Sequence, residues 1–480
     1  MLFNSLEFLL FFPITVILYF LLPHKSRRYF LLLASVFFYM SFIPKYILIV
    51  GFTTVVDYAG ALLIDKFRER KAIKRTVFIT GILLNVGLLV VYKYLGVIGD
   101  TINFFGNMIS LETVVLPKLA LPIGISFHTF QSMGYYIDTY KGTVKPERNF
   151  INFALFLMFF PQLVAGPIER TANLMGQLKA RHTLKAENIS IGGRWMLWGM
   201  FKKIVVADSL AIFADAVFDK IGNFSGAGLI IGLLCFTVQI YCDFSGYSDI
   251  AIGCAKIMDI DLMKNFNTPY FSASVPEFWR RWHISLSSWF KDYIYIPLGG
   301  NRVSKPRWVF NQLVTFTVSG VWHGAGYNFV VWGFLNGIYI VISRLIAPIK
   351  DGFKRITRLD RVPWLSKPFA ILITFALISF SWIFFRANSF DDAFYFISNM
   401  FGSTKMTFDS DSASLFRIWV TIGSVIILFV VELLMSYGKK AVSLFYRAPH
   451  FCRVALYGLL TAVIIVCGVF GENQFIYFDF

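Results

Sequence analysis

The chain has 480 residues, of which 57% are hydrophobic and 15% are charged, and its formal net charge is +17. Because a soluble domain usually carries about a quarter charged residues, this composition excludes a soluble enzyme and predicts a polytopic membrane protein. The basic residues lie in the loops between apolar stretches, which is the positive-inside pattern of membrane proteins, so the charge does not indicate nucleic-acid binding.

Apolar stretches near the roughly 20 residues that cross a bilayer recur along the whole chain. The clearest predicted spans are 6–22, 28–43, 45–64, 77–93, 151–166, 227–242, 327–346, 368–386, 418–436 and 454–471, with shorter or polar-interrupted stretches near 118–135, 195–213 and 310–324. We therefore expect an all-α protein with about ten to thirteen spans. Two mixed aromatic and charged stretches, 166–225 and 255–310, predict re-entrant or interfacial helices that are buried in protein or line a cavity.

The sequence contains no tandem repeat or low-complexity tract, so we expect one integral-membrane domain over 1–480. Its parts are N-terminal helices over 1–150, a core over about 151–346 that carries the candidate chemistry, C-terminal helices over 347–471 and a tail over 472–480. The loops predicted to be cytoplasmic because they are basic are 24–28, 65–75, 141–148, 344–367 and 439–453. Alternation of the spans then places both termini outside the cytoplasm.

The stretch EFWRRWHISLSSWF, from Glu277 to Phe290, sets charge among aromatic residues. Ser274 and Glu277 have capping-box spacing with a proline between them, which predicts that a helix begins here. On that helix Trp279, His283, Leu286 and Phe290 share one face, and Arg280, Ser287 and Lys291 share another. The segment is therefore either an interfacial anchor at headgroup level or the lining of a cytoplasmic entrance.

A second histidine, His323, interrupts an apolar run in the sequence VWHGAG. An ionisable residue within a membrane segment indicates a functional site by default. Histidine can act as a general base near neutral pH, and burial favours its neutral, proton-accepting form. The alternative is a neutral histidine whose ring nitrogens bond to neighbouring polar groups.

Further polar groups occur in FPQLVAGPIER and VQIYCDFSGYSDIAIG. They include Gln162, Ser245, Asp243 and Asp249. For the two aspartates, structural pairing, for example with an arginine or a histidine N–H, remains open. His128 lies in another embedded stretch and is a weaker candidate. The five cysteines show no metal-ligand spacing, so we expect no metal site.

At these motifs the chain resembles the membrane-bound O-acyltransferase family, and within it the bacterial alginate O-acetyltransferase branch. The motifs that carry the resemblance are FPQLVAGPIER, YCDFSGYSDIAIG, NFNTPYFSASVPEFWRRWHISLSSWFKDYIYIPLGGNR and VSGVWHGAGYNFVVWG. The resemblance implies a ring of tilted helices around a central tunnel that joins a cytoplasmic and an outer funnel. It assigns the family's signature histidine to His323 and its second histidine to His283.

The resemblance also implies transfer of an acyl group from a cytoplasmic thioester onto a hydroxyl. The donor would be an acyl-coenzyme A or an acyl carrier protein, with no permanently bound cofactor. Its anionic part suits the basic residues Arg280, Arg281, Lys291 and Arg302, while Asp243, Ser245, Asp249, Trp322 and Gln162 would line or support the tunnel. We expect acetylation of an extracellular polysaccharide at a bacterial inner membrane, with a separate extracytoplasmic acetyltransferase as partner.

The terminal sequence FIYFDF offers Tyr477 as a transient acyl carrier on the outer side. The alternative is an aromatic anchor at the membrane interface. Other functions remain open for the whole chain: transfer of another acyl group, such as D-alanine from a carrier protein, export of an acylated lipid or glycan, and a purely structural membrane subunit.

Overall fold

The computed structural model describes residues 1–480 except 110–112, 114, 118, 120–121, 165, 358–361, 407–413, 439–442, 446, 471–474 and 477–480. The described residues are helical, apart from loops and one isolated bridge between Ser225 and Lys405. The chain forms two compact units, Met1–Met196 with Ser248–Met263 and Leu197–Tyr247 with Lys264–Phe480. The all-α fold predicted from the sequence is confirmed, whereas the prediction of a single domain stays a prediction.

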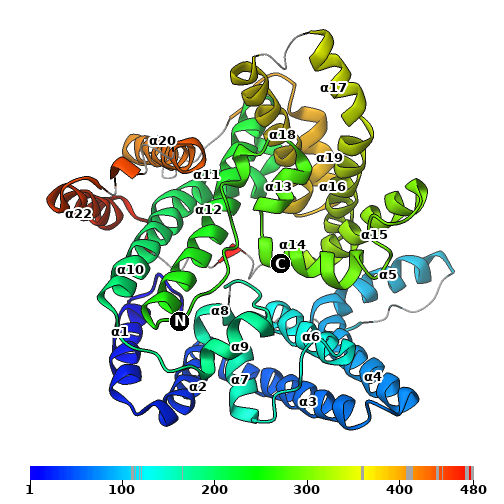
Figure 1. Ribbon diagram of the computed structural model, residues 1–480. Helices are drawn as coiled ribbons and strands as arrows, with labels where there is room; N and C mark the ends of the chain where they lie inside the picture. Colours follow the sequence, from blue (N-terminus) through cyan, green and yellow to red (C-terminus); the bar gives the residue numbers. More distant parts are fainter. Residues whose placement is uncertain are drawn as a thin grey trace. The chain divides into compact units, whose positions relative to one another are not determined.

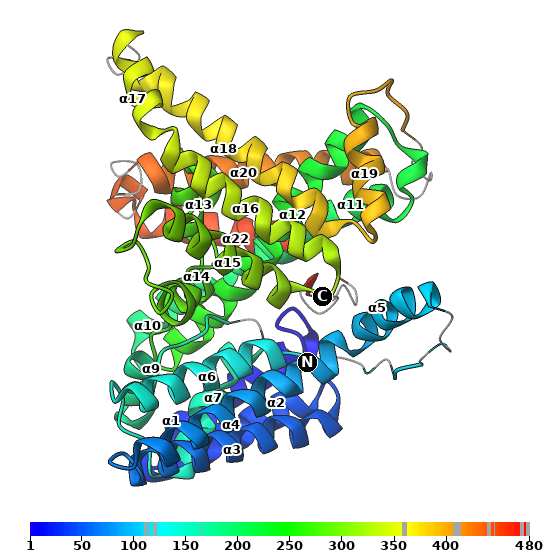
Figure 2. The same cartoon turned by 90° about the vertical axis from the view of Figure 1, so that its right-hand side faces the viewer.

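The first unit contains α1 (Leu6–Leu21), α2 (His24–Met40), α3 (Ile47–Lys66), α4 (Lys71–Leu89), α5 (Leu95–Met108), α6 (Ile125–Lys141), α7 (Phe150–Met158), α8 (Phe160–Leu163), α9 (Thr171–Lys179) and most of α10 (Ala186–Met200) (Figure 1). A π-helical turn, Val90–Tyr94, joins α4 to α5 without a break. The helices α3, α4 and α6 lie side by side (Figure 2).

Buried polar pairs join α3 to α6 in this unit. Thr53 Oγ1 lies 2.9 Å from His128 Nε2, and one turn further along both helices Ser132 donates a hydrogen bond to Asp57. Asn85 of α4 donates to the other Asp57 oxygen at 2.7 Å. Because buried polar groups are costly unless they are paired, these contacts give His128 a structural place between helices.

The predicted span 151–166 is not one helix. The helix α7 ends at Met158 and α8 begins at Phe160, with Phe159 at ψ 110° between them. Pro161 has no N–H for the carbonyl four residues earlier and its ring clashes with that turn, so the first helix cannot continue. The side chain of Gln162 donates instead to the Phe156 carbonyl at 2.6 Å, which satisfies part of the broken ladder.

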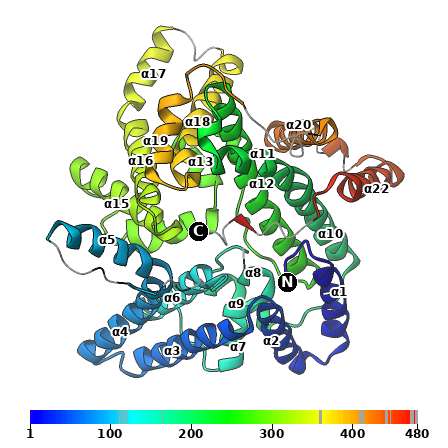
Figure 3. The ribbon, with the colours of Figure 1, turned by 180° about the vertical axis from the view of Figure 1, so that it is seen from behind.

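The second unit contains a π-helical turn (Phe201–Ala207), α11 (Asp208–Asp219), the first part of α12 (Ala227–Ile257), α13 (Val275–Arg281), α14 (Ile284–Phe290), α15 (Lys305–His323), α16 (Tyr327–Leu345), α17 (Ala347–Ile356), α18 (Pro363–Arg386), α19 (Phe390–Asn399), α20 (Leu415–Tyr437) and α22 (His450–Cys467). Both α20 and α22 pack on the π-helical turn, and α16 packs along α18 (Figure 3).

A glycine-lined crossing joins α15 to α16. A Cβ atom added to Gly320 would lie 2.1 Å from the Phe329 carbonyl oxygen, and one added to Gly333 would lie 2.3 Å from the Phe316 carbonyl oxygen. Only glycine permits this approach of two backbones, as in other membrane helix pairs built on small residues. The crossing fixes the end of α15, where His323 lies.

Within the described residues, seven helices are long and apolar enough to cross a membrane. They are Pro44–Lys66, Lys71–Met108, Ala227–Ile257, Tyr327–Leu345, Trp364–Arg386, Leu415–Tyr437 and His450–Cys467. The chain is therefore a multi-pass membrane protein, as its composition predicted. The larger number of spans expected from the sequence is not confirmed, since several predicted stretches form shorter helices such as α1 and α7.

Candidate functional site

The segment EFWRRWHISLSSWF does not form the single helix that its spacing predicted. The helix α13 ends at Arg281 and α14 begins at Ile284. The predicted N-cap is confirmed, because Ser274 Oγ accepts a hydrogen bond from the Glu277 backbone N–H at 3.3 Å. Glu277 reaches back to the N–H of Ala273 at 2.9 Å, one residue earlier than in a standard capping box.

The break at His283 depends on Asn265, which lies 18 residues earlier. His283 adopts a left-handed backbone conformation, with φ 42° and ψ 56°. The Asn265 carbonyl accepts from the Ile284 N–H at 2.8 Å, and the Asn267 N–H donates to the Arg281 carbonyl at 2.9 Å. These bonds satisfy backbone groups at the end of α13 and at the start of α14. The segment 265–267 therefore stabilises the break between the two helices.

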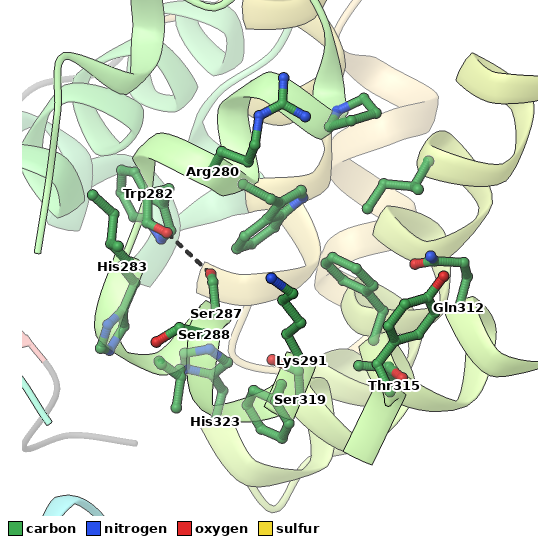
Figure 4. A pocket seen from close by; sticks show the side chains of 18 residues that line it. Arg280, Trp282, His283, Ser287, Ser288, Lys291, Gln312, Thr315, Ser319 and His323 are labelled. Carbon is green, nitrogen blue, oxygen red and sulfur yellow. Dashed lines mark hydrogen bonds between the residues drawn. The ribbon is translucent and has the colours of Figure 1, made fainter. Parts of the chain in front are cut away.

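A cavity of about 390 Å³ brings His283 and His323 together (Figure 4). Its walls come from α13 and α14, from the turn that follows α14, and from α15 and α16. Its volume falls within the range of small-molecule sites. The two histidines were assigned from separate sequence motifs, and the structure places both of them on this one cavity.

His323 is surrounded by aromatic rings. Its ring lies edge-on to Trp322 at 4.8 Å, to Trp332 at 5.0 Å and to Phe385 at 5.4 Å, as distances between ring centroids. Trp332 in turn stacks on Trp382 of α18 at 5.6 Å. Only 4% of the histidine surface is exposed, so its side chain is largely shielded from bulk solvent.

His283 is equally buried. Phe244 meets its ring edge-on at 4.5 Å, and its Nδ1 atom lies 3.1 Å from Asn265 Oδ1. Burial lowers the pKa of the His283 imidazole to about 3. The side chain is therefore neutral at physiological pH and can donate from only one ring nitrogen at a time.

Two of the four predicted donor-binding cations lie on the cavity. Arg280 and Lys291 both line it and are both solvent-exposed. Arg281 instead forms an ion pair with Glu277 at 2.6 Å, and Arg302 is exposed but is not part of the cavity wall. The positive charge at this site therefore comes from two side chains on different helical segments.

A polar stripe on α15 also lines the cavity and was missed in the sequence. Its members, three, four and four residues apart, are Gln312, Thr315, Ser319 and His323. This is the spacing of one helix face, so the periodicity could have revealed it. Thr and Ser are common in membrane helices, so these residues do not stand out in the sequence.

Two of the predicted supporting residues, Asp243 and Ser245, bond to lysines. Asp243 pairs with Lys203 at 2.7 Å, and its other oxygen accepts from the Ile476 N–H at 2.8 Å. Ser245 accepts a hydrogen bond from Lys202 at 2.8 Å. The pairing that the sequence left open for Asp243 is therefore present, with a lysine as partner.

Four further residues were predicted at the site: Trp322, Asp249, Gln162 and Tyr477. Trp322 is buried and contacts the ring of His323 but does not line the cavity. Asp249 is buried on α12 in the first unit, and Gln162 belongs to the same unit. Tyr477 lies outside the described residues. Their predicted roles in a tunnel or an acyl relay stay predictions.

The C-terminal segment reaches the neighbourhood of His283. Phe475 is fully buried, and its ring lies 5.5 Å from Phe244 and 4.7 Å from Tyr247. Phe244 also contacts the ring of His283. Phe475 therefore packs within the second unit, against aromatic residues of α12.

Comparisons with known proteins show what this chain is similar to. Residues 146–385 match the family model described as MBOAT, membrane-bound O-acyltransferase family, and this range contains the cavity. The probable alginate O-acetylase of Pseudomonas aeruginosa is 35% identical over 452 residues, which cover 94% of this chain and 83% of the relative.

Two further relatives have different acceptors in their names. The peptidoglycan O-acetyltransferase of Helicobacter pylori is 36% identical over 434 residues, covering 84% of this chain and 80% of the relative. The teichoic acid D-alanyltransferase of Bacillus subtilis is 25% identical over 278 residues, covering 56% and 69%. The similarity thus extends over relatives that transfer different acyl groups.

Proposed function

The chain belongs to the membrane-bound O-acyltransferase family, and from this premise we propose that it moves an acetyl group from a cytoplasmic thioester donor across the membrane for O-acetylation of an extracellular polysaccharide. The observation that carries the proposal is that His283 and His323 line one cavity together with two cations. Because the chain is an O-acyltransferase, the alternatives of an exporter and a structural subunit are set aside.

The chemistry assigns His323 as the general base. The acceptor hydroxyl oxygen attacks the thioester carbonyl carbon, a C–O bond forms and the C–S bond breaks. His323 accepts the hydroxyl proton during the attack and returns it to the departing sulfur, which leaves as a free thiol. General-base help of this kind is typically worth about 10²–10⁴-fold in rate.

The donor enters past Arg280 and Lys291. Phosphate groups of coenzyme A or of a phosphopantetheine carrier are anionic, and both side chains are exposed cations on the cavity wall. The pantetheine arm carries two amides that need hydrogen-bond partners inside a protein. The polar stripe of α15, with Thr315 and Ser319, supplies such partners beside an otherwise aromatic wall.

The acceptor is an extracellular polymer, and a separate extracytoplasmic acetyltransferase completes the transfer. Support comes from the relatives, whose names give alginate and peptidoglycan as acceptors. The protein resides in a bacterial inner membrane with both termini outside the cytoplasm, a proposal that rests on the basic loops of the sequence. Tyr477 remains the proposed acyl relay on that side.

A D-alanyl group is the second candidate, because a D-alanyltransferase is among the relatives at 25% identity. Purified protein in vesicles distinguishes the two when it is supplied with acetyl-coenzyme A, acetyl carrier protein or D-alanyl carrier protein. Thiol release that requires an acetyl donor supports the proposal. Release only with the D-alanyl carrier would replace acetyl by D-alanyl transfer.

A further inference from the structure

We propose that Asn265 is a positioning residue that fixes the tautomer of His283, so that Nδ1 holds the proton and Nε2 presents its lone pair to the reacting groups. The inference deepens the proposed function and rests on it for its catalytic meaning. It assigns a role to the first residue of the motif NFNTPYF, which lies outside the cavity wall and was not among the predicted site residues.

The orientation of the Asn265 amide follows from its partners. Its Oδ1 atom accepts from the Ser285 backbone N–H at 3.2 Å and from the Ser285 hydroxyl at 2.9 Å. A backbone N–H can only donate, so the atom that faces it must be the amide oxygen and not the amide nitrogen. The same oxygen faces His283 Nδ1 at 3.1 Å.

The tautomer of the imidazole follows from that oxygen. An amide oxygen only accepts hydrogen bonds, so the ring nitrogen opposite it must donate. A neutral imidazole carries one N–H, and with this proton on Nδ1 the basic lone pair belongs to Nε2. His283 lines the cavity and Asn265 does not, so we assign Nε2, the ring nitrogen that is not bonded to Asn265, to the cavity side.

The surroundings keep this arrangement in place. Asn265 is 1% exposed and Ser285 is fully buried, so water does not compete for these bonds. The left-handed backbone of His283 is uncommon for a residue with a Cβ atom. The backbone carbonyl of Asn265 accepts a hydrogen bond from the Ile284 N–H at 2.8 Å. Asn265 therefore orients both the main chain after His283 and the imidazole ring.

In this proposal the two histidines have different roles in the reaction. His323 takes and returns the proton, while Nε2 of His283 accepts a hydrogen bond from the acceptor hydroxyl or from an amide of the donor. A ring in the other tautomer would place an N–H there and repel the same donor. Loss of the Asn265 oxygen should therefore lower the rate of transfer more than the affinity for the thioester.

The tautomer can be measured without any acyl transfer. Solid-state NMR of protein labelled with ¹⁵N-histidine distinguishes a ring nitrogen that carries hydrogen from one that does not, and the His283 signals are those that disappear in His283→Gln. We expect a protonated Nδ1 and an unprotonated Nε2 in the unaltered protein. Asn265→Asp keeps the accepting oxygen and should keep this tautomer, whereas Asn265→Leu should lose it. An Nε2 proton in the unaltered protein would overturn the proposal.

Activity provides the second readout, with Ser285→Ala and Asn311→Ala as controls. Ser285→Ala removes a different donor to the same oxygen, and the buried Asn311 bonds the Gly300 carbonyl at 3.1 Å, away from either histidine. We expect Asn265→Leu to lower kcat at least about tenfold, by analogy with other residues that orient a histidine, and both controls to stay within about threefold. Equal losses in all three would make Asn265 merely structural and refute the proposal.

The Asn265→Asp variant gives a distinctive pH profile. A carboxylate beside His283 favours the imidazolium form and raises the pKa of that ring. Because the lone pair of Nε2 is then lost at a higher pH, the acid limb of the rate profile should move upward while activity near pH 8 is retained. An unchanged profile with full activity would contradict the role given to Asn265. If no variant or unaltered protein transfers an acyl group, the proposed function fails while the NMR result still decides the tautomer.

Discussion

His323 at the end of α15 lies edge-on to Trp332 of α16, with ring centroids 5.0 Å apart and an angle of 86° between the ring planes. The contact exists because Gly320 and Gly333 let the two helix backbones touch. The position of the proposed base is therefore set by a helix crossing that contains no ionisable group.

A substitution at this crossing should disable the enzyme without touching the cavity. In Gly320→Ala the new Cβ atom would lie 2.1 Å from the Phe329 carbonyl oxygen, so the helices must separate. We expect a large loss of acyl transfer, at least about tenfold, and a lower midpoint of thermal unfolding. Activity assays and thermal unfolding in detergent measure both effects. The control is Gly423→Ala on α20, where a Cβ atom meets nothing within 4 Å; a similar loss there would rule out the crossing as the cause.

The two cations on the cavity should act on donor binding. Arg280→Gln and Lys291→Gln should each raise KM for the thioester by about tenfold, since a charge-assisted hydrogen bond contributes about 1.5–3 kcal/mol, and leave kcat nearly unchanged. Arg281→Gln is the matched control, because Arg281 pairs with Glu277 and does not line the cavity. Initial rates against donor concentration provide the measurement. A larger rise in KM for Arg281→Gln than for Arg280→Gln would mean that the donor approaches from elsewhere.

The buried ion pair at Asp243 should support the C-terminal segment. Asp243→Asn weakens the pair with Lys203 and the bond that holds the Ile476 N–H. Breaking a buried pair costs about 3–5 kcal/mol of stability. Lys203 keeps a second carboxylate partner, Asp208 at 2.9 Å, so we expect a cost near the lower end of this range. The midpoint temperature of thermal unfolding should fall by several degrees. Asp215→Asn removes a half-exposed partner of Arg386 and should have little effect; equal shifts in the two variants would contradict this account.

The pKa of His283 predicts how stability depends on pH. Because burial holds that pKa at about 3, below its value in the unfolded chain, the unfolded state binds more protons between the two values. The contribution of His283 is therefore complete above about pH 6.5 and is lost as the pH falls toward 3. His283→Gln should flatten part of the acid decline in the unfolding midpoint. Parallel declines for the variant and the unaltered protein between pH 7 and pH 4.5 would disprove the assignment.

Local sequence patterns predicted several parts of this site correctly. The Ser274 cap and the apolar runs that form α16, α18 and α20 depend on spacing of a few residues, which a sequence displays directly. Both histidines could be selected because an ionisable group is rare in an apolar segment. The structure then adds that they share one cavity, which spacing alone could not reveal.

The predictions that were wrong have different physical causes. The break at His283 requires Asn265 to hold the turn, and no helical periodicity reveals a partner 18 residues away. The span 151–166 was misjudged because the high hydrophobicity outweighed Pro161, which ends α7. The rings that contact Phe475 belong to Phe244 and Tyr247, more than 220 residues earlier in the chain, so spacing in the sequence could not identify them.

The most direct test of acyl transfer by His323 is the O-acetyl ester content of the host's surface polysaccharide. It should be compared between unaltered protein, His323→Ala and His128→Ala at matched membrane levels, in a strain that lacks the native copy. We predict that ester is lost in His323→Ala and retained in His128→Ala, whose side chain pairs with Thr53 in the first unit. Full acetylation by His323→Ala, where deletion of the protein abolishes it, would contradict the account.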